Sequence, residues 1–171
     1  GVGRTGTLFA YEQYGIEPDI MTLAKGLGSG VPIGAILAKD GASVFVPGDH
    51  GSTFGGNVLA CAASYATLRF IIDNDIAGNA KRVGSYFING LEGLKQKFDF
   101  ITDVRGCGLL VAVEFSSDIA QSVLMACLDG GLLVNRLKPN AMRFMPPLTI
   151  GNQEVDKALG ILDRALSSIV N

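Results

Sequence analysis

A lysine placed between an apolar run and a dense glycine segment constrains this sequence more than any other feature. Residues 19–24 read Asp-Ile-Met-Thr-Leu-Ala and predict a buried strand that ends at Lys25. The next five residues, Gly-Leu-Gly-Ser-Gly, predict a loop, because glycines at this density lose too much conformational entropy in a helix or strand. A cationic side chain thus follows a strand, beside backbone that can approach a ligand closely.

Two interpretations of Lys25 follow from this position. Burial disfavours the charged form of a lysine, and the resulting free amine can form a Schiff base with a carbonyl compound. Alternatively, the ammonium group of Lys25 reaches solvent at the end of the strand, since lysine is rarely buried without a partner or a role. Composition alone does not decide between them.

Two further glycine-rich segments are candidate anion-binding loops. Gly1, Gly3 and Gly6 have the spacing of a dinucleotide-binding motif, but the strand and the acidic residue that such a site requires are not evident, so we expect no nucleotide. Ser52 and Thr53 offer hydroxyls and amides near the start of a predicted helix, where phosphate is favoured. Simple N-capping by this segment is an equal alternative.

Arg143 lies within the apolar segment Ala-Met-Arg-Phe-Met-Pro-Pro-Leu, which predicts a strand. A guanidinium in such surroundings needs a carboxylate, which either a substrate or a protein side chain supplies. Both sources stay open. For Arg4 and Arg105, the sequence indicates no role beyond a structural one.

The hydrophobic pattern predicts an α/β fold whose halves differ. Residues 33–38 predict a second strand, and the apolar segment 57–73 predicts a buried helix. Spacings of three and four between apolar residues predict an amphipathic helix over 80–98. The remainder predicts strands near 101–105, 109–115, 132–137 and 141–145, a helix over about 118–129 ended by two glycines, and a last helix capped by Asn152.

Charge and cysteine content exclude several kinds of partner. The net charge is −2, and no basic stripe is available to neutralise nucleic acid. Three separated cysteines and a lone His50, expected to be a loop hydrogen-bonding residue, argue against a metal site and favour a reducing, cytoplasmic location. No apolar run reaches the roughly 20 residues of a membrane span. The sequence has 48% hydrophobic and only 18% charged residues. Because exposed apolar patches usually mark interfaces, we expect a buried contact with another chain.

Six segments together resemble the class III (subgroup II) pyridoxal-phosphate-dependent aminotransferases. They follow the order of that family over nearly the whole chain. The segments are Gly1-Val-Gly-Arg-Thr-Gly6, Phe9-Ala-Tyr-Glu12, Gly15-Ile-Glu-Pro-Asp-Ile-Met-Thr-Leu-Ala-Lys-Gly26, Val31-Pro-Ile-Gly-Ala35, Gly48-Asp-His-Gly-Ser-Thr-Phe-Gly-Gly-Asn57 and Arg143-Phe-Met-Pro-Pro-Leu148.

The resemblance implies pyridoxal 5′-phosphate as cofactor, no metal, and a role for each candidate residue. Lys25 matches the lysine that forms the Schiff base with the cofactor. Thr53 matches a residue that bonds the cofactor phosphate across a dimer interface, and Ser52 matches a nearby substrate contact. Arg143 matches the arginine that holds the α-carboxylate of the amino acid or oxo acid.

The implied fold is the C-terminal portion of a fold type I transferase. Residues 1–77 would end the large cofactor domain, and residues 78–171 would form the small α/β domain of a homodimer with shared active sites. Other cofactor contacts of the family lie upstream of Gly1, so we expect a piece of something longer, inactive alone.

The implied reaction is amino transfer from N-acetylornithine to 2-oxoglutarate, a step of arginine biosynthesis. Ornithine, succinylornithine and 4-aminobutyrate are the alternative amino donors. A non-catalytic phosphate-binding or assembly module, or a fragment that serves only in dimerisation, is the alternative outside enzymes.

Overall fold

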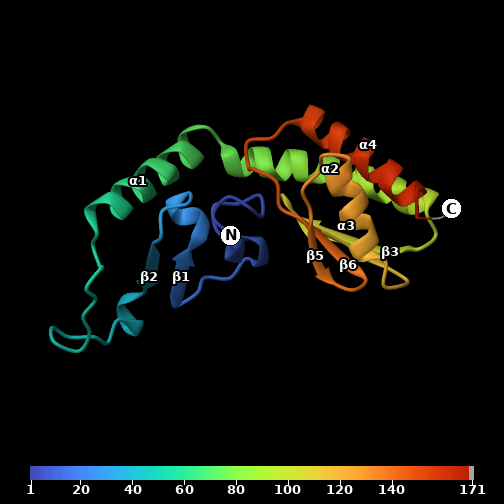
Figure 1. Cartoon of the computed structure of the whole chain (residues 1–171). Helices are drawn as coiled ribbons and strands as arrows, with labels where there is room; N and C mark the ends of the chain where they lie inside the picture. The colour runs from blue at the N-terminus through green and yellow to red at the C-terminus, as the bar shows by residue number, and fades with distance from the viewer. Residues whose placement is uncertain (170–171) are drawn as a thin grey trace.

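Two helices, α1 (Val58–Asp73) and α2 (Ile76–Lys97), follow one another and link the two halves of an elongated molecule (Figure 1). The structure is a computed structural model that describes residues 1–169. A side chain caps each helix: Asn57 accepts from the Ala60 N–H at 3.0 Å, and Asp75 accepts from the Gly78 N–H at 3.2 Å. These caps separate the helices at residues 74–75.

The C-terminal half is a four-stranded antiparallel sheet packed against three helices. The strands are β3 (Ile101–Cys107), β4 (Leu110–Phe115), β5 (Asn135–Lys138) and β6 (Ala141–Phe144), in the order β3-β4-β6-β5. The helices are α2, α3 (Ala120–Asp129) and α4 (Asn152–Ser167). Buried residues alternate with exposed or half-exposed ones along β4, so the helices cover one face of the sheet.

The main hydrophobic core lies between this sheet and its helices. The expected amphipathic helix is confirmed in α2, whose Val83, Phe87 and Leu91 are buried. The ring of Phe87 packs edge-on against Phe144 of β6, with 5.3 Å between the ring centres. From α3 and α4 the core receives Val123, Cys127, Val155, Leu162 and Leu166.

The expected stop of α3 at two glycines is confirmed. Gly131 has φ +83° and donates its N–H to the Leu128 carbonyl at 2.9 Å, while Leu132 donates to the Cys127 carbonyl at 2.8 Å. This pair of bonds is a Schellman motif, and it satisfies carbonyls at the end of the helix. The chain then turns toward β5.

The N-terminal half contains a two-stranded antiparallel sheet and a small hydrophobic cluster. Strand β1 (Ile20–Ala24) pairs with β2 (Gly34–Ala38), and three short 3₁₀ helices, η1 (Ala10–Tyr14), η2 (Lys25–Gly28) and η3 (Asp40–Ala42), flank them. The cluster comprises Val2, Leu27, Ile71 and Ile76.

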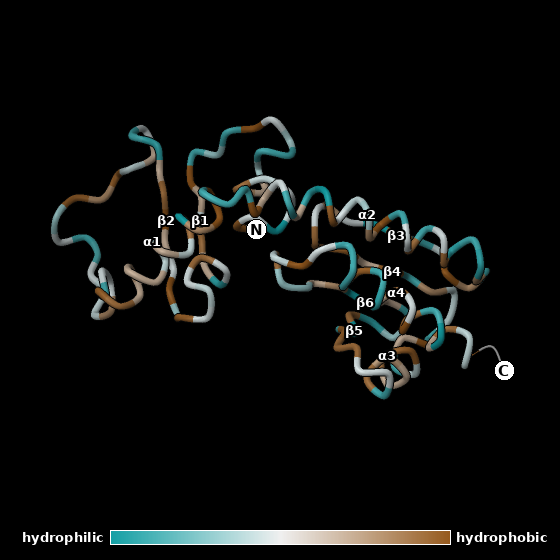
Figure 2. The backbone as a smooth tube through the Cα atoms, turned by 90° about the horizontal axis from the view of Figure 1, so that it is seen from above, coloured by the Kyte–Doolittle hydropathy of each residue, from teal (hydrophilic) through white to brown (hydrophobic). Residues whose placement is uncertain are grey.

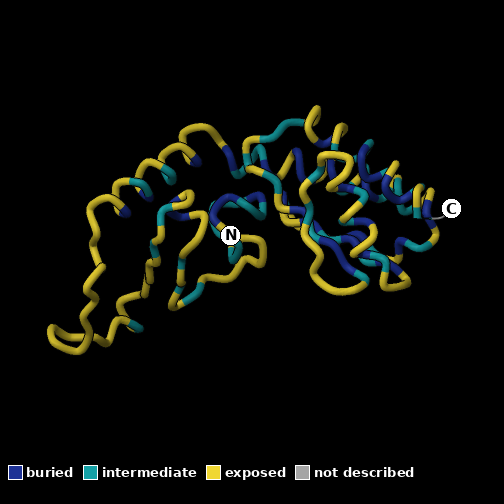
Figure 3. Tube along the Cα trace, viewed as in Figure 1, coloured by how far each residue is buried: buried dark blue, intermediate teal, exposed yellow. Residues whose placement is uncertain are grey.

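The strands at 19–24 and 33–38 and the helix at 57–73 form as expected, but the prediction that the first strand and the helix are buried is wrong for this chain. All of β2 is exposed, β1 alternates between exposed and half-exposed residues, and α1 buries only Ala60, Ser64 and Ile71. Figures 2 and 3 show apolar but exposed backbone here, whereas buried segments concentrate in the other half. The apolar pattern is that of a core, but the described residues supply no opposite surface.

Three element boundaries differ from the expectation. The third helix begins at Ala120 and strand β5 at Asn135, both later than predicted. The cap of α4 is Gly151 and not Asn152, since the Gly151 N–H donates to the Glu154 carboxylate at 2.8 Å. A side-chain acceptor three residues into the helix thus replaces the expected N-cap.

Two glycines allow α2 to lie directly against the β3–β4 turn. A Cβ built on Gly84 of α2 would overlap the carbonyl group of Gly108, and Gly108 itself has φ +56°. On the same helix, a Cβ on Gly93 would meet no atom within 4 Å. The two positions therefore form a matched pair for a stability test.

We expect Gly84→Ala to destabilise the protein by about 1–3 kcal/mol, because the backbone of the β3–β4 turn must move. Gly93→Ala should stabilise it by roughly 0.5–1 kcal/mol through helix propensity. Urea unfolding of both variants measures the difference. Equal effects of the two substitutions would contradict the close packing of α2 on the turn.

Candidate functional site

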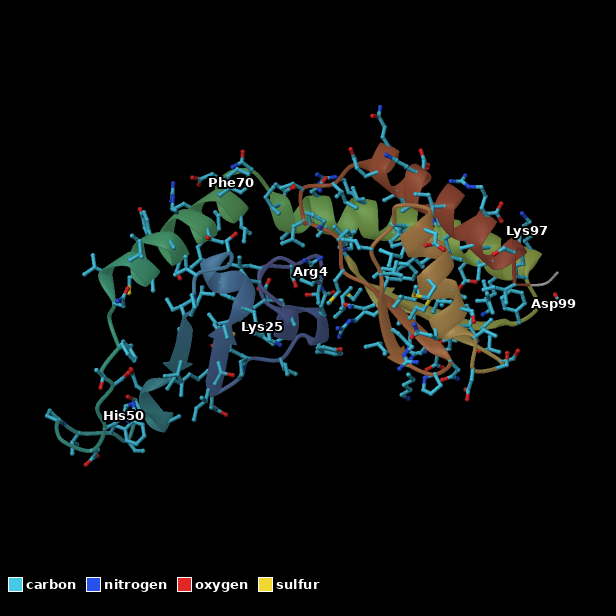
Figure 4. All side chains as sticks on the ribbon, in the orientation of Figure 1. Arg4, Lys25, His50, Phe70, Lys97 and Asp99 are labelled. Atoms are coloured by element: carbon cyan, nitrogen blue, oxygen red, sulfur yellow. The ribbon has the colours of Figure 1, made fainter. Side chains whose placement is uncertain are left out.

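A cleft of about 1120 Å³ contains both Lys25 and Arg143. Its walls come from the start of the chain, the end of β1 with η2, the C-terminal part of α1, and the segment 143–149 that includes the end of β6. Figure 4 shows Lys25 and Arg4 near the middle of the molecule, on neighbouring segments. The fold therefore brings together two of the four predicted site residues, which are 118 positions apart in the sequence.

Lys25 stands where β1 ends and η2 begins. Its φ of +52° lies in the left-handed region, which costs a non-glycine residue about 1–2 kcal/mol. Such strain concentrates at functional positions. The side chain is exposed, which is the solvent-reaching alternative considered above, and residues 1–169 do not bury the amine. The reason is the one found for β1: the cleft wall on this side is open.

Arg143 lies in β6 and is partly buried. Its Nε is fully enclosed and has no hydrogen-bond partner, and no carboxylate among the described residues forms an ion pair with the guanidinium. A buried donor left unsatisfied is costly, commonly about 1–3 kcal/mol. Of the two carboxylate sources considered above, a protein side chain is therefore not seen within the described chain.

The nearby carboxylates are already occupied by another arginine. Register places Arg105 of β3 opposite Ala112 of β4, which in turn lies opposite Arg143, so both arginines share one face of the sheet. Arg105 donates to Glu114 at 2.7 Å and also forms an ion pair with Asp103. Hydrogen bonding from Arg105 lowers the pKa of Glu114. Arg105 thus pairs with both carboxylates, and the N–H groups of Arg143 have no carboxylate partner among the described residues.

Ser52 and Thr53 do not reach this cleft. They lie in an exposed loop between β2 and α1, outside the residues that line the cleft. Figure 4 labels His50, next to this loop, at the far end of the N-terminal half from Arg4 and Lys25. The N-capping alternative is wrong, because Asn57 caps α1. His50 stacks on Phe45 with 6.0 Å between ring centres, rather than serving as the expected hydrogen-bonding residue.

The glycine segment at the start of the chain is packed into protein. A Cβ on Gly3 would lie 3.2 Å from Leu148, and one on Gly6 would lie 3.0 Å from Lys81. Arg4 donates from Nη1 to the carbonyls of Leu109, at 3.2 Å, and Pro146. These contacts explain the glycines through close packing. The role of Arg4 at the cleft had no signal in the sequence, because its partners are backbone carbonyls more than 100 residues away.

Three further observations bear on ligands and location. Within residues 1–169, no group of three or more His, Cys, Asp or Glu side chains could hold a metal ion. None of the helices in that range has the length and apolar character needed to cross a membrane. The cysteines are all free thiols, and burial raises the pKa of Cys127 to about 11.

Comparison with known proteins identifies relatives along the whole chain. Residues 1–166 match the family model described as aminotransferase class-III. An acetylornithine aminotransferase of Caldanaerobacter subterraneus is 50% identical over 99% of this chain, and one of Methanocaldococcus jannaschii is 43% identical over 99%. The chain spans 43% and 42% of these two relatives, less than half of their length.

Solved structures agree with the fold. Acetylornithine aminotransferase from Elizabethkingia anophelis matches with a TM-score of 0.92 and 37% identity, over 98% of this chain and 45% of that one. Ornithine aminotransferase from Toxoplasma gondii matches with a TM-score of 0.92 and 38% identity, over 99% and 41%. The expected family and the expected α/β fold class are thereby confirmed.

The Arg105 cluster gives a pH-dependent prediction. Because the pKa of Glu114 is lowered in the folded state, its ion pair stabilises the protein above the ordinary glutamate pKa and is lost as the pH falls through the lowered value. Arg105→Gln should therefore reduce the free energy of unfolding at neutral pH and change it less in acid. Urea unfolding at both pH values checks this, and a difference independent of pH would refute it.

Proposed function

Since the chain belongs to the class III aminotransferase family, we propose that it forms the C-terminal part of a pyridoxal-phosphate-dependent aminotransferase. Residues 1–77 would complete the large cofactor domain and residues 78–171 would form the small domain. The observation that carries this proposal is the shared cleft, which is lined both by Lys25 and by Arg143, whose buried Nε has no partner.

The cleft residues fit the cofactor. The cleft has a volume of about 1120 Å³, which suffices for a cofactor and a substrate together. Added Cβ atoms on Gly26 and Gly30, beside Lys25, would meet nothing within 4 Å, so the backbone there leaves open space. Lys25 would hold the cofactor covalently. Pyridoxal phosphate, when bound, supplies an electron sink for the carbanion left by proton removal.

Two residues of this chain would bind the substrate and transfer the proton. Arg143 binds the carboxylate of the amino acid or oxo acid through paired hydrogen bonds, which fixes the orientation of the substrate. Nζ of Lys25, when not bonded to the cofactor, would take the proton from the substrate carbon as a general base and deliver it as a general acid to the cofactor carbon. A well-placed base of this kind contributes about 10²–10⁴-fold to the rate.

Thr53 and Ser52 would act in the active site of a second copy. Their loop is exposed and lies outside the cleft that holds Lys25, which suits a contribution in trans. The adjoining surface is strongly apolar: Phe45, Phe54 and Val58 are 71%, 83% and 82% exposed. Exposed apolar patches of this kind mark interfaces. We therefore propose a homodimer in which Thr53 bonds the cofactor phosphate and Ser52 contacts substrate.

We propose N-acetylornithine as the amino donor and 2-oxoglutarate as the acceptor. Acetylornithine aminotransferases are among the relatives that match most of this chain, up to 50% identical. Ornithine is the alternative donor that a comparison favours, since an ornithine aminotransferase has the same fold at 38% identity. The free thiols suit a cytoplasmic enzyme.

Lys25→Ala should abolish turnover and covalent cofactor attachment in the complete enzyme. Borohydride treatment followed by peptide mass mapping should place the reduced cofactor on Lys25 in the wild type. Lys39→Ala is the matched control, because Lys39 is an exposed lysine whose partners are Glu17 and Asp19. Repeated turnover by Lys25→Ala without added amine would contradict the proposal, and a protein that takes up no cofactor would favour a non-catalytic module.

Arg143→Ala should raise KM for both the amino donor and 2-oxoglutarate by roughly 10–100-fold, because a charge-assisted pair is lost. Arg136→Ala on the neighbouring strand β5 is the control and should leave KM unchanged. Steady-state kinetics with both substrates measure this effect. An unchanged KM for both substrates in Arg143→Ala would exclude carboxylate binding by this residue.

A further inference from the structure

Arg4 lines the cleft and bonds the chain beside two paired strands, β4 and β6, of which β6 carries Arg143. Its guanidinium donates to the carbonyl of Pro146, three residues after Arg143, and to the carbonyl of Leu109, next to the start of β4. Strand β4 pairs with β6 over the register Val111–Phe144 to Glu114–Ala141. One side chain therefore holds the entrance of β4 and the exit of β6.

The backbone of Arg4 is fixed on the same β3–β4 turn that its guanidinium contacts. Its carbonyl accepts from the Leu109 N–H at 2.9 Å, and a Cβ on Gly108 would lie 2.5 Å from this same oxygen. Two residues earlier, Val2 packs in the small cluster with Leu27. Leu27 belongs to η2, the element that begins with Lys25. Contacts thus run without a gap from the element of Lys25, through residues 2–4, to the segment after Arg143.

The segment that Arg4 holds leaves the sheet after Phe144. Arg143 and Phe144 are paired with β4, whereas residues 145–147 follow the strand. Met145 and Pro147 line both the Lys25 cleft and a second cavity of about 420 Å³. Among hydrogen bonds of the described residues, only that from Arg4 reaches the Pro146 carbonyl. This bond is a restraint on residues 145–147 that the pairing of β6 does not supply.

We propose that Arg4 is a positioning residue that sets the placement of Arg143 relative to Lys25, and through it the affinity for substrate carboxylates. This inference rests on the proposed function. Arginine suits the task because its planar group offers several donors in a fixed arrangement. The half-buried site desolvates the guanidinium, which lowers the pKa of Arg4. Loss of the side chain would leave the Pro146 carbonyl without its partner and free residues 145–147 to move.

The test compares Arg4→Met, which keeps an unbranched stem but no donors, with Arg4→Lys, which keeps the charge. Arg82→Met is the matched control, because Arg82 is an exposed arginine whose ion pair is with Asp75 at 3.0 Å. Calorimetric titration of the cofactor-free complete enzyme with glutarate, a simple dicarboxylate, measures carboxylate affinity without catalysis. Arg143→Ala provides the reference for lost binding.

Arg4→Met should bind glutarate roughly tenfold more weakly than the wild type, as expected for loss of hydrogen bonds from a charged donor. Arg4→Lys should show a smaller loss and Arg82→Met none. In the holoenzyme, KM for both substrates should rise more than kcat falls. Reduction with borohydride should still fix the cofactor on Lys25 in each Arg4 variant.

Two results would overturn the inference. One is wild-type glutarate affinity in Arg4→Met. The other is a result in which both Arg4→Met and Arg4→Lys lose glutarate binding in parallel with melting temperature and cofactor uptake. That result would indicate that Arg4 has only a structural role. Failure of the proposed function looks different: the wild type itself would take up no cofactor, or its glutarate binding would not depend on Arg143.

Discussion

A guanidinium held in a sheet without a carboxylate of its own is the constraint on which this molecule depends. Arg143 keeps a buried, unpartnered Nε, while the acids nearest in register, Asp103 and Glu114, are bound to Arg105. Arg143 also lines the cleft that Lys25 lines. A buried donor without a partner calls for an explanation, and the proposed carboxylate site supplies one.

The two halves of the chain differ in how completely they are packed. The C-terminal half has a complete core between sheet and helices, and this core fixes β6 and with it Arg143. The N-terminal half carries Lys25 on a small sheet with one minor cluster and much exposed apolar surface. The chain spans less than half the length of its curated relatives. Under the proposed function, the rest of a cofactor domain and a dimer partner would cover these open faces.

How much the sequence predicts depends on where each residue finds its partners. Local signals succeed: the spacing in α2, the glycines after α3 and the strand that ends at Lys25 all form as expected. Burial of β1 and α1 is not predicted correctly, because apolar composition does not show which chain supplies the covering surface. The motifs point to Lys25 and Arg143 individually. The contacts of Arg4 at the cleft could not be predicted, because its partners are main-chain carbonyls of distant residues.

A crystal structure of the complete enzyme with pyridoxal phosphate and glutarate would decide whether Lys25 and Arg143 form one site. We expect the cofactor joined to Lys25, a glutarate carboxylate paired with the guanidinium of Arg143 in the same cleft, and Thr53 of a second copy at the phosphate. A structure in which Arg143 pairs with a carboxylate of the protein, with glutarate bound elsewhere, would contradict this expectation.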